Sequence, residues 1–345
     1  MQQPLFSIII PVYNAAETLQ AAVDSILKQS VQDFELILVD DGSRDGSSEL
    51  CRELAEQDSR IRAFFQKNGG ICAARNSGLA QAKGRYVGFC DDDDRYLPLA
   101  LQTAKSLIEQ TDADVVRGGY ELQRETQAGY MVTLPHAPGQ PCRLEKGKNG
   151  CAYLQFLTNS GPQFVWNAFY RREFLEDTKF DEHCRYGLED FLFNAALYAN
   201  NASAAYDPTP VYRHYERSDS TSAATIRAVV SRGQTLPAWV RAEYCAAKAR
   251  CEEEQFSSVW AARKAEFVTF LMHQLRDSRA SSPVCRRAWR TLRRALQNVN
   301  GAGDTLDFLR VARHNKKQAV ALLLYATHTQ GLYAHLPNKE EKILK

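Results

Sequence analysis

Four consecutive aspartates, at positions 91 to 94, directly follow an apolar segment over residues 85–90 that has the composition of a strand. Like charges repel one another, and removing any of them from water is costly. A divalent cation removes this objection, because Mg²⁺ and Mn²⁺ typically bind one or two carboxylates together with phosphate oxygens of a substrate. The run therefore indicates either a metal site or an acidic, solvated turn, and alone it favours neither.

Two more polar segments follow predicted strands, PVYN at residues 11–14 and DDGS at residues 40–43. Ligands of open parallel sheets bind beyond the carboxyl ends of the strands, so the three segments should line one crevice. Tyr13 offers a flat face for a base, and Asp40 offers a carboxylate to a ring N–H such as that of uracil. Arg75 could reach a base carbonyl or a phosphate. This combination suits a nucleotide-activated substrate.

The elements that must position these residues alternate between strand and helix signals. Apolar runs predict buried strands, and apolar residues at helical spacing predict helices. The order implies a parallel sheet with right-handed crossovers. The predicted strands cover residues 5–11, 34–39, 61–65, 86–90 and 114–120, and the helices cover 16–29, 47–57, 71–83 and 99–110.

The remainder of the chain has a different character. Residues 129–150 are rich in Gly, Pro and polar residues, which is typical of a connection or flap. Helical and strand signals resume over residues 151–215. Beyond residue 222 the sequence predicts only helices, over residues 226–241, 242–276, 284–299 and 305–327.

In order and spacing, four motifs resemble those of family 2 inverting glycosyltransferases: PVYN at 11–14, VDDGSRD at 39–45, ARNSG at 74–78 and GFCDDDD at 88–94. The resemblance covers about residues 5–220. It implies an α/β fold of the glycosyltransferase A type, with a mostly parallel nucleotide-binding sheet and flanking helices. We expect a catalytic domain over residues 1–222, with a donor half at about 1–128 and an acceptor half at about 129–222. A helical C-terminal region over residues 223–345 follows.

The acidic motif of that family is Asp-any-Asp, and residues 91–93 match it best. The resemblance implies that Asp91 faces the ribose or the metal and that Asp93 binds the metal, either Mn²⁺ or Mg²⁺. The run of four leaves the register ambiguous by one, so Asp92 could take the ribose role. The same resemblance implies that the nucleotide, most often UDP, is bound by Pro11, Tyr13, Asp40 and Arg75.

The family's catalytic base is an Asp about 100 residues beyond the metal motif, and GLEDF at residues 187–191 fits this pattern. Inversion needs one carboxylate to take a proton from the acceptor hydroxyl as it attacks the anomeric carbon. Asp190 is the expected base, and Glu189 could orient it or touch the acceptor. The alternative is that both acids merely cap the helix over residues 191–198.

Two further segments resemble parts of the family. Trp166 could form one wall for an acceptor sugar or be a core tryptophan. In the segment over residues 212–218, Arg213 or Arg217 could neutralise charge on the leaving diphosphate. His214 is either a further metal ligand or a packing or surface histidine.

Composition limits the classes of partner. The net charge of +2 implies no general attraction to polyanions, and the basic residues have no recognised nucleic-acid-binding fold, so we expect no nucleic-acid binding. Nine scattered cysteines, no signal peptide and no apolar stretch of 18 residues predict a cytoplasmic protein. The arginine-rich segment 286–294 is either a membrane-surface helix, which would place the protein on the inner face of the cell membrane, or a solvated basic face, or an oligomer contact.

The sequence therefore predicts a metal-assisted inverting hexosyl- or N-acetylhexosaminyl-transferase. Its expected donor is a UDP-sugar and its acceptor a glycan or lipid-linked glycan, in bacterial capsule, lipopolysaccharide or other surface polysaccharide synthesis. One alternative is a sugar nucleotidyltransferase, although the loop at residues 11–16 lacks the Gly and Lys that such enzymes often carry. Another is a catalytically degenerate binding module, against which the intact acidic motifs argue.

Overall fold

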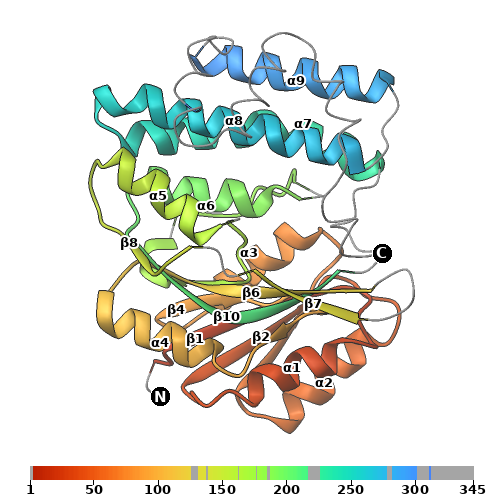
Figure 1. Cartoon of the computed structure of the whole chain (residues 1–345). Helices are drawn as coiled ribbons and strands as arrows, with labels where there is room; N and C mark the ends of the chain where they lie inside the picture. The colour runs from red at the N-terminus through yellow and green to blue at the C-terminus, as the bar shows by residue number, and fades with distance from the viewer. Residues whose placement is uncertain are drawn as a thin grey trace.

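The computed structural model describes residues 3–125, 131–136, 139–161, 163–175, 177–184, 187–216, 226–277, 282–300 and 311. A single mixed sheet forms its base, and helices cover both faces (Figure 1). Among the described helices, none is long and apolar enough to cross a membrane.

The first half of the sheet has the predicted alternation of strands and helices. The strands are β1 Phe6–Val12, β2 Phe34–Asp40, β3 Ile61–Phe65 and β4 Tyr86–Phe89, and the helices are α1 Leu19–Leu27, α2 Ser47–Gln57 and α3 Ile71–Gln81. The strands are parallel and lie in the order β3-β2-β1-β4. Both β1 and β2 are buried along their whole length, as is usual for parallel strands with helices on both faces.

Helix α1 begins three residues later than predicted, because side chains from the loop after β2 and from the start of α2 hold the segment before it. The N–H of Ala15 donates to Ser47 Oγ (2.8 Å), and that of Ala16 donates to Asp45 Oδ2 (3.0 Å). These donors therefore have partners outside a helix, and the loop after β1 is tied to the loop after β2 and to the start of α2.

The second half of the sheet mixes strand directions. Its strands are β5 Arg95–Tyr96, β6 Val115–Glu125, β9 Ala168–Arg171 and β10 Ala204–Glu216; α4 Ala100–Thr111 and the short helix η1 Arg172–Leu175 accompany them. Strand β9 runs antiparallel to both β4 and β6, whereas β6 and β10 are parallel. The α/β fold class is confirmed, and the parallel arrangement holds for β1 to β4.

The described part of residues 129–150, predicted as a connection or flap, contains two strands that were not predicted, β7 Met131–His136 and β8 Cys142–Leu144. These strands pair antiparallel with β6 and β10 respectively. Pro135 is tolerated in β7 because, among the described strands, β7 pairs with β6 alone and leaves its other edge without a ladder.

The helices α5 Gly150–Ser160, α6 Glu189–Ala199, α7 Ile226–Arg250, α8 Glu253–Asp277 and α9 Ser282–Asn300 are stacked over one face of the sheet (Figure 1). Helix α7 continues through the break predicted after residue 241, and the break falls before Glu253. Glu253 and Glu254 occupy the first turn of α8, where acids favour a helix start. The helix predicted at 305–327 lies outside the described residues, apart from position 311.

Two hydrophobic clusters lie on opposite faces of the sheet. One contains residues of α1, α2 and α4. The other runs from the sheet through α6 to α7, α8 and α9 without interruption. The start of α6 is therefore packed between the sheet and the C-terminal helices.

Candidate active site

The loop after β1 lies directly beside the acidic run. The backbone N–H of Tyr13 donates to Asp92 Oδ2 (2.9 Å), while Tyr13 as a residue is 51% exposed. Pro11 is buried within β1, opposite Val39 of β2. The polar segments after β1 and β4, expected to share one crevice, are therefore joined by a hydrogen bond.

Asp40 ends β2 and is almost fully buried. Its carboxylate accepts hydrogen bonds from Ser48 Oγ (2.6 Å) and from the N–H of Ser43 (3.3 Å). These bonds fix the position of the carboxylate that was expected to meet a base.

Asp41, which we had not singled out, fixes the start of α3. Its two oxygens accept the N–H groups of Gly69 (2.8 Å) and Gly70 (2.7 Å) and the side chain of Gln66 (2.7 Å). Gly70 has φ of +91°, a conformation that favours glycine. The Gly-Gly pair before a helix was the sequence signal for this contact, and it positions the helix that carries Arg75.

Arg75 is the centre of the site, with only 1% of its surface exposed. One terminal nitrogen donates to Asp190 (2.8 Å) and Glu189 (3.2 Å), and the other donates to Asp91 (3.0 Å). We expected this guanidinium to reach a base or a phosphate, but in the structure it binds three carboxylates. It thereby links the end of β4 to the start of α6.

Glu189 and Asp190 are the first two residues of α6. Asp190 Oδ2 also accepts the backbone N–H of Val165 (3.1 Å). Burial raises the pKa of Asp190 to about 7, even though the Arg75 guanidinium opposes this shift. Glu189 adds to the rise, and its own Oε2 is buried without a hydrogen-bond partner. A carboxylate with such a pKa is suited to accept a proton near neutral pH.

The backbone immediately before this acidic pair is strained. Gly187 and Leu188 have φ of +90° and +75°. For leucine this left-handed conformation costs on the order of 1–2 kcal/mol. Strain of this kind is found where surrounding packing over-determines the backbone.

Asp92 and Asp94 have different surroundings within the acidic run. Burial raises the pKa of Asp92 to about 8, and the charges of Asp93 and Asp91 add to this rise. Asp94 is fully buried and accepts hydrogen bonds from His214 Nδ1 (2.8 Å) and from the N–H of Tyr215 (2.8 Å). Strand β10 therefore anchors the run, a contact that sequence reasoning missed because its partners lie 120 residues apart.

His214 forms an ion pair with Asp94. Burial disfavours its charged form, but the Asp94 hydrogen bond and charge outweigh this and raise the pKa of His214 to about 9. The pair ties strand β10 to the acidic run through a charge-assisted hydrogen bond.

The other predicted contacts have packing partners. Trp166 is 5% exposed, and its ring stacks between those of Phe164 and Tyr212, with ring centroids 4.6 Å and 4.5 Å apart respectively. This packing favours a core role over an acceptor wall. Arg213 pairs with Glu121 (2.9 Å). Arg217 lies outside the described residues.

The carboxylates of Asp91 and Asp93 have the donor chemistry that Mn²⁺ or Mg²⁺ prefers. No group of three or more His, Cys, Asp or Glu side chains within the described part of the chain is arranged to hold a metal. Substrate phosphates would have to complete the coordination, as is common for these cations. Burial is the main cause of the raised pKa of Asp92, the charges of Asp93 and Asp91 add to it, and a nearby cation would favour the ionised carboxylate. The residues present therefore fit a metal that arrives with its substrate.

Comparison with known proteins gives a consistent result. Residues 7–178 match the model of glycosyl transferase family 2. The chain is 36% identical over 200 residues to the uncharacterized glycosyltransferase EpsJ of Bacillus subtilis, covering 56% of each chain. It is 28% identical over 222 residues to the cholesterol galactosyltransferase of Borreliella burgdorferi, covering 63% of this chain and 62% of that one. It therefore spans little more than half the length of these relatives.

Solved structures share the fold. The structure of S. aureus TarS 1–349 in complex with UDP-GlcNAc has a TM-score of 0.70 at 20% identity, covering 95% of this chain and 89% of that one. The mannosyltransferase PcManGT of Pyrobaculum calidifontis, solved with GDP-Man and Mn²⁺, has a TM-score of 0.55 at 18% identity, covering 96% and 85%. At these identities the likeness concerns the fold alone.

Proposed function

Residues 7–178 belong to glycosyl transferase family 2, and from that membership we propose that this chain is a glycosyltransferase that moves a sugar, with inversion, from a nucleotide-diphosphate donor to an acceptor hydroxyl. The observation that carries the proposal is the position of Arg75. Its guanidinium is bound to Asp91 of the acidic run and to Asp190 of the acidic pair. Groups suited to hold the donor and to activate the acceptor therefore meet at one buried cation.

Asp190 is the proposed general base. As an acceptor hydroxyl attacks the anomeric carbon, Asp190 takes its proton, and Arg75 and the Val165 N–H hold the carboxylate in place for this step. Each carboxylate oxygen has two acceptor positions, so both can still receive a hydrogen bond from the acceptor. Glu189 has a buried oxygen without a partner, which supports a contact with the acceptor or the donor sugar.

The proposed donor is a UDP-linked hexose or N-acetylhexosamine. The exposed ring of Tyr13 is available for stacking on a base, and Asp40 is held at the end of the neighbouring strand. TarS has been solved with UDP and with UDP-GlcNAc, and the Borreliella relative is a galactosyltransferase. Asp91 and Asp93 would hold Mn²⁺ or Mg²⁺, which would supply positive charge to the departing diphosphate.

The first experiment is a nucleotide-release assay. Purified protein is incubated with UDP-, GDP-, CMP- and dTDP-sugars, with and without Mn²⁺, and slow donor hydrolysis is followed without an acceptor. We expect metal-dependent release of UDP from one donor, and loss of this release in Asp93→Asn. If no donor is hydrolysed and UDP also fails to bind in the presence of Mn²⁺, the donor assignment is wrong. Binding without turnover on any acceptor would favour a degenerate module.

The proposed acceptor is a glycan or lipid-linked glycan in surface polysaccharide synthesis, reached from the inner face of a membrane. Support comes from helix α9, which carries five arginines. Because an α-helix turns by about 100° per residue, these arginines all lie on one side of α9, within an arc of about 120°. Trp289, Leu292 and Leu296 on its opposite side are buried in the core, so contact with lipid would be electrostatic and sensitive to salt. The arginines are Arg286, Arg287, Arg290, Arg293 and Arg294.

Vesicle sedimentation tests this membrane contact. Binding to vesicles with anionic phosphatidylglycerol should fall in the triple variant of Arg286, Arg290 and Arg294 to Gln. A matched variant removes three exposed cations elsewhere, at Lys28, Arg52 and Lys105, and should bind as the wild type does. Equal binding by both variants would leave α9 with a solvated basic face only.

A further inference from the structure

Helix α6 packs along α7, one of the C-terminal helices that lie outside the family match. Trp239 of α7 is 1% exposed, and its ring centroid lies 5.2 Å from that of Phe191. Phe191 directly follows Asp190 in the first turn of α6. The indole ring therefore contacts the residue next to the proposed base.

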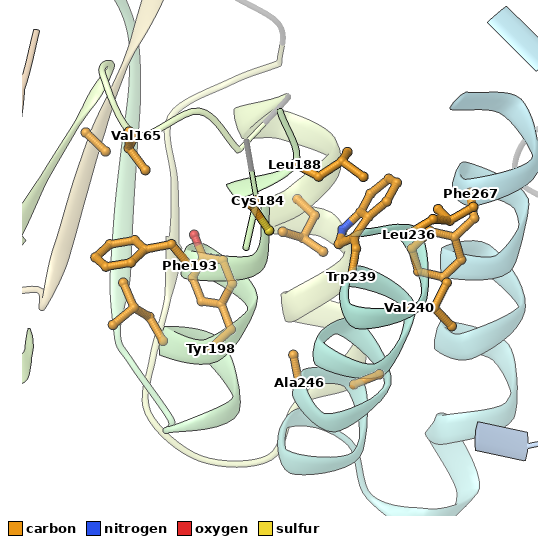
Figure 2. Packing of buried hydrophobic residues seen from close by; sticks show 14 of the residues in the cluster. Val165, Cys184, Leu188, Phe193, Tyr198, Leu236, Trp239, Val240, Ala246 and Phe267 are labelled. Atoms are coloured by element: carbon orange, nitrogen blue, oxygen red, sulfur yellow. The ribbon is translucent and has the colours of Figure 1, made fainter. Parts of the chain in front are cut away.

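The residue on the other side of the acidic pair lies in the same environment. Leu188 is 4% exposed and belongs to the same hydrophobic cluster as Trp239. Figure 2 shows its side chain pointing toward the indole ring. Its left-handed backbone, with φ of +75°, needs surrounding packing to persist. Packing around Trp239 thus flanks Glu189 and Asp190 on both sides.

Trp239 is itself held rigidly by α7 and α8. Its indole N–H donates to Glu243 (3.3 Å), whose carboxylate pairs with the buried Arg263 of α8 (2.7 Å). Phe267 and Phe270 of α8 make edge-to-face contacts with the indole ring, with ring centroids 4.7 Å and 5.2 Å away respectively. A rigid ring against the first turn of α6 fixes where that turn can lie.

We propose that Trp239 is a positioning residue for Asp190, which makes the C-terminal helices part of the catalytic apparatus. The inference rests on the proposed role of Asp190 as the base. A carboxylate displaced by about 1 Å can lose about 100-fold in rate, so small movements of this turn matter for proton transfer. In the described part of the chain, α7 packs mainly against α5, α6, α8 and α9, away from strands β1, β2 and β4, so we expect donor binding to be unaffected.

Trp260 of α8 supplies a matched control. It is equally buried, at 1% exposure, and packs against Tyr244, Phe256 and Phe267 of α7 and α8, with no described ring contact to α6. In hydrolysis of UDP-GlcNAc, Trp239→Leu should lower kcat about 10- to 100-fold while KM for the donor changes less than about threefold. Trp260→Leu should keep kcat within about threefold of the wild type. Trp239→Phe, which retains an aromatic ring, should recover most of the loss.

Hydrogen exchange gives a readout that does not depend on activity. The amides of Leu192 and Phe193, in the first turns of α6, should exchange at least about tenfold faster in Trp239→Leu and unchanged in Trp260→Leu. Wild-type exchange at these amides in Trp239→Leu, or equal loss of kcat in both variants, would overturn the inference. If the wild type does not hydrolyse UDP-GlcNAc, the hydrogen-exchange result alone decides whether Trp239 positions this turn. The donor assignment is tested separately by the release assay with UDP-, GDP-, CMP- and dTDP-sugars.

Discussion

The two acidic groups of the site are neutralised in different ways. At the start of α6, Asp190 and Glu189 share a buried guanidinium that belongs to the protein. At the end of β4, Asp94 pairs with His214 and Asp91 with Arg75, yet burial and neighbouring carboxylates still raise the pKa of Asp92. The first group carries its own counter-charge, and additional positive charge would stabilise the second.

This difference suggests a division of labour. Asp190, whose pKa burial raises to about 7, can exchange a proton near neutral pH. Crowded carboxylates suit a metal that arrives with phosphates. Because Arg75 touches both groups, it can relate the position of the donor to that of the base.

The largest expected effect comes from removing the base. Asp190→Asn keeps the shape of the side chain and its bond from Val165 but cannot accept a proton, so kcat for transfer should fall about 10²- to 10⁴-fold. UDP binding, measured by calorimetry, should stay within about threefold. Asp177→Asn, an exposed carboxylate between η1 and α6, is the control and should be fully active. Full activity of a folded Asp190→Asn would assign the base elsewhere.

Removing a proposed metal ligand should have a different signature. Asp93→Asn should lower the rate about 100-fold and weaken the dependence of UDP binding on Mn²⁺, because a metal supplies several kcal/mol to the leaving diphosphate. In Asp190→Asn that dependence should be retained. Identical Mn²⁺ titrations for Asp93→Asn and the wild type would remove Asp93 from the metal site.

Arg75 tests whether the two groups are truly connected. Arg75→Met leaves three carboxylates around an empty position and should lower the free energy of unfolding by about 3–5 kcal/mol, as loss of one partner of a buried ion pair does. Arg75→Lys keeps the charge but not the fork that binds both groups, so it should retain more stability than activity. Urea denaturation and the release assay measure the two effects. If Arg75→Lys recovered stability and activity to the same extent, the positive charge at this position would be sufficient and the forked guanidinium would not be needed.

The part of the fold that the sequence predicts best is β1 to β4 with their helices. Buried parallel strands read as continuous apolar runs, and the bounds of α2 and β3 agree residue for residue with the structure. The sequence did not predict the two-residue β5 or the short β7 and β8, because their pairing depends on neighbouring strands and not on a local sequence pattern.

The site divides in the same way. The order of the polar segments at strand ends predicted that they meet, but no local pattern predicts partners that are more than 100 residues apart. Arg75 binds residues 114 and 115 positions away, and Asp94 binds residues 120 and 121 positions away. For Trp166 the sequence left an acceptor wall and a core position open, and the structure places its ring in a stack with Phe164 and Tyr212.

The smallest effect expected is the pH dependence, and it distinguishes the two acidic groups. A base must be ionised to act, and burial raises the pKa of Asp190 to about 7. The rate should therefore fall about tenfold per pH unit below pH 7 and level off above it. The pKa of Asp92, raised to about 8 by burial among other carboxylates, should instead fall when Mn²⁺ adds positive charge nearby. A rate profile measured at two Mn²⁺ concentrations separates these cases. If the rate falls to half of its plateau near pH 7 at both Mn²⁺ concentrations, ionisation of Asp190 controls the rate. If this midpoint moves to lower pH as Mn²⁺ increases, ionisation of the acidic run controls it.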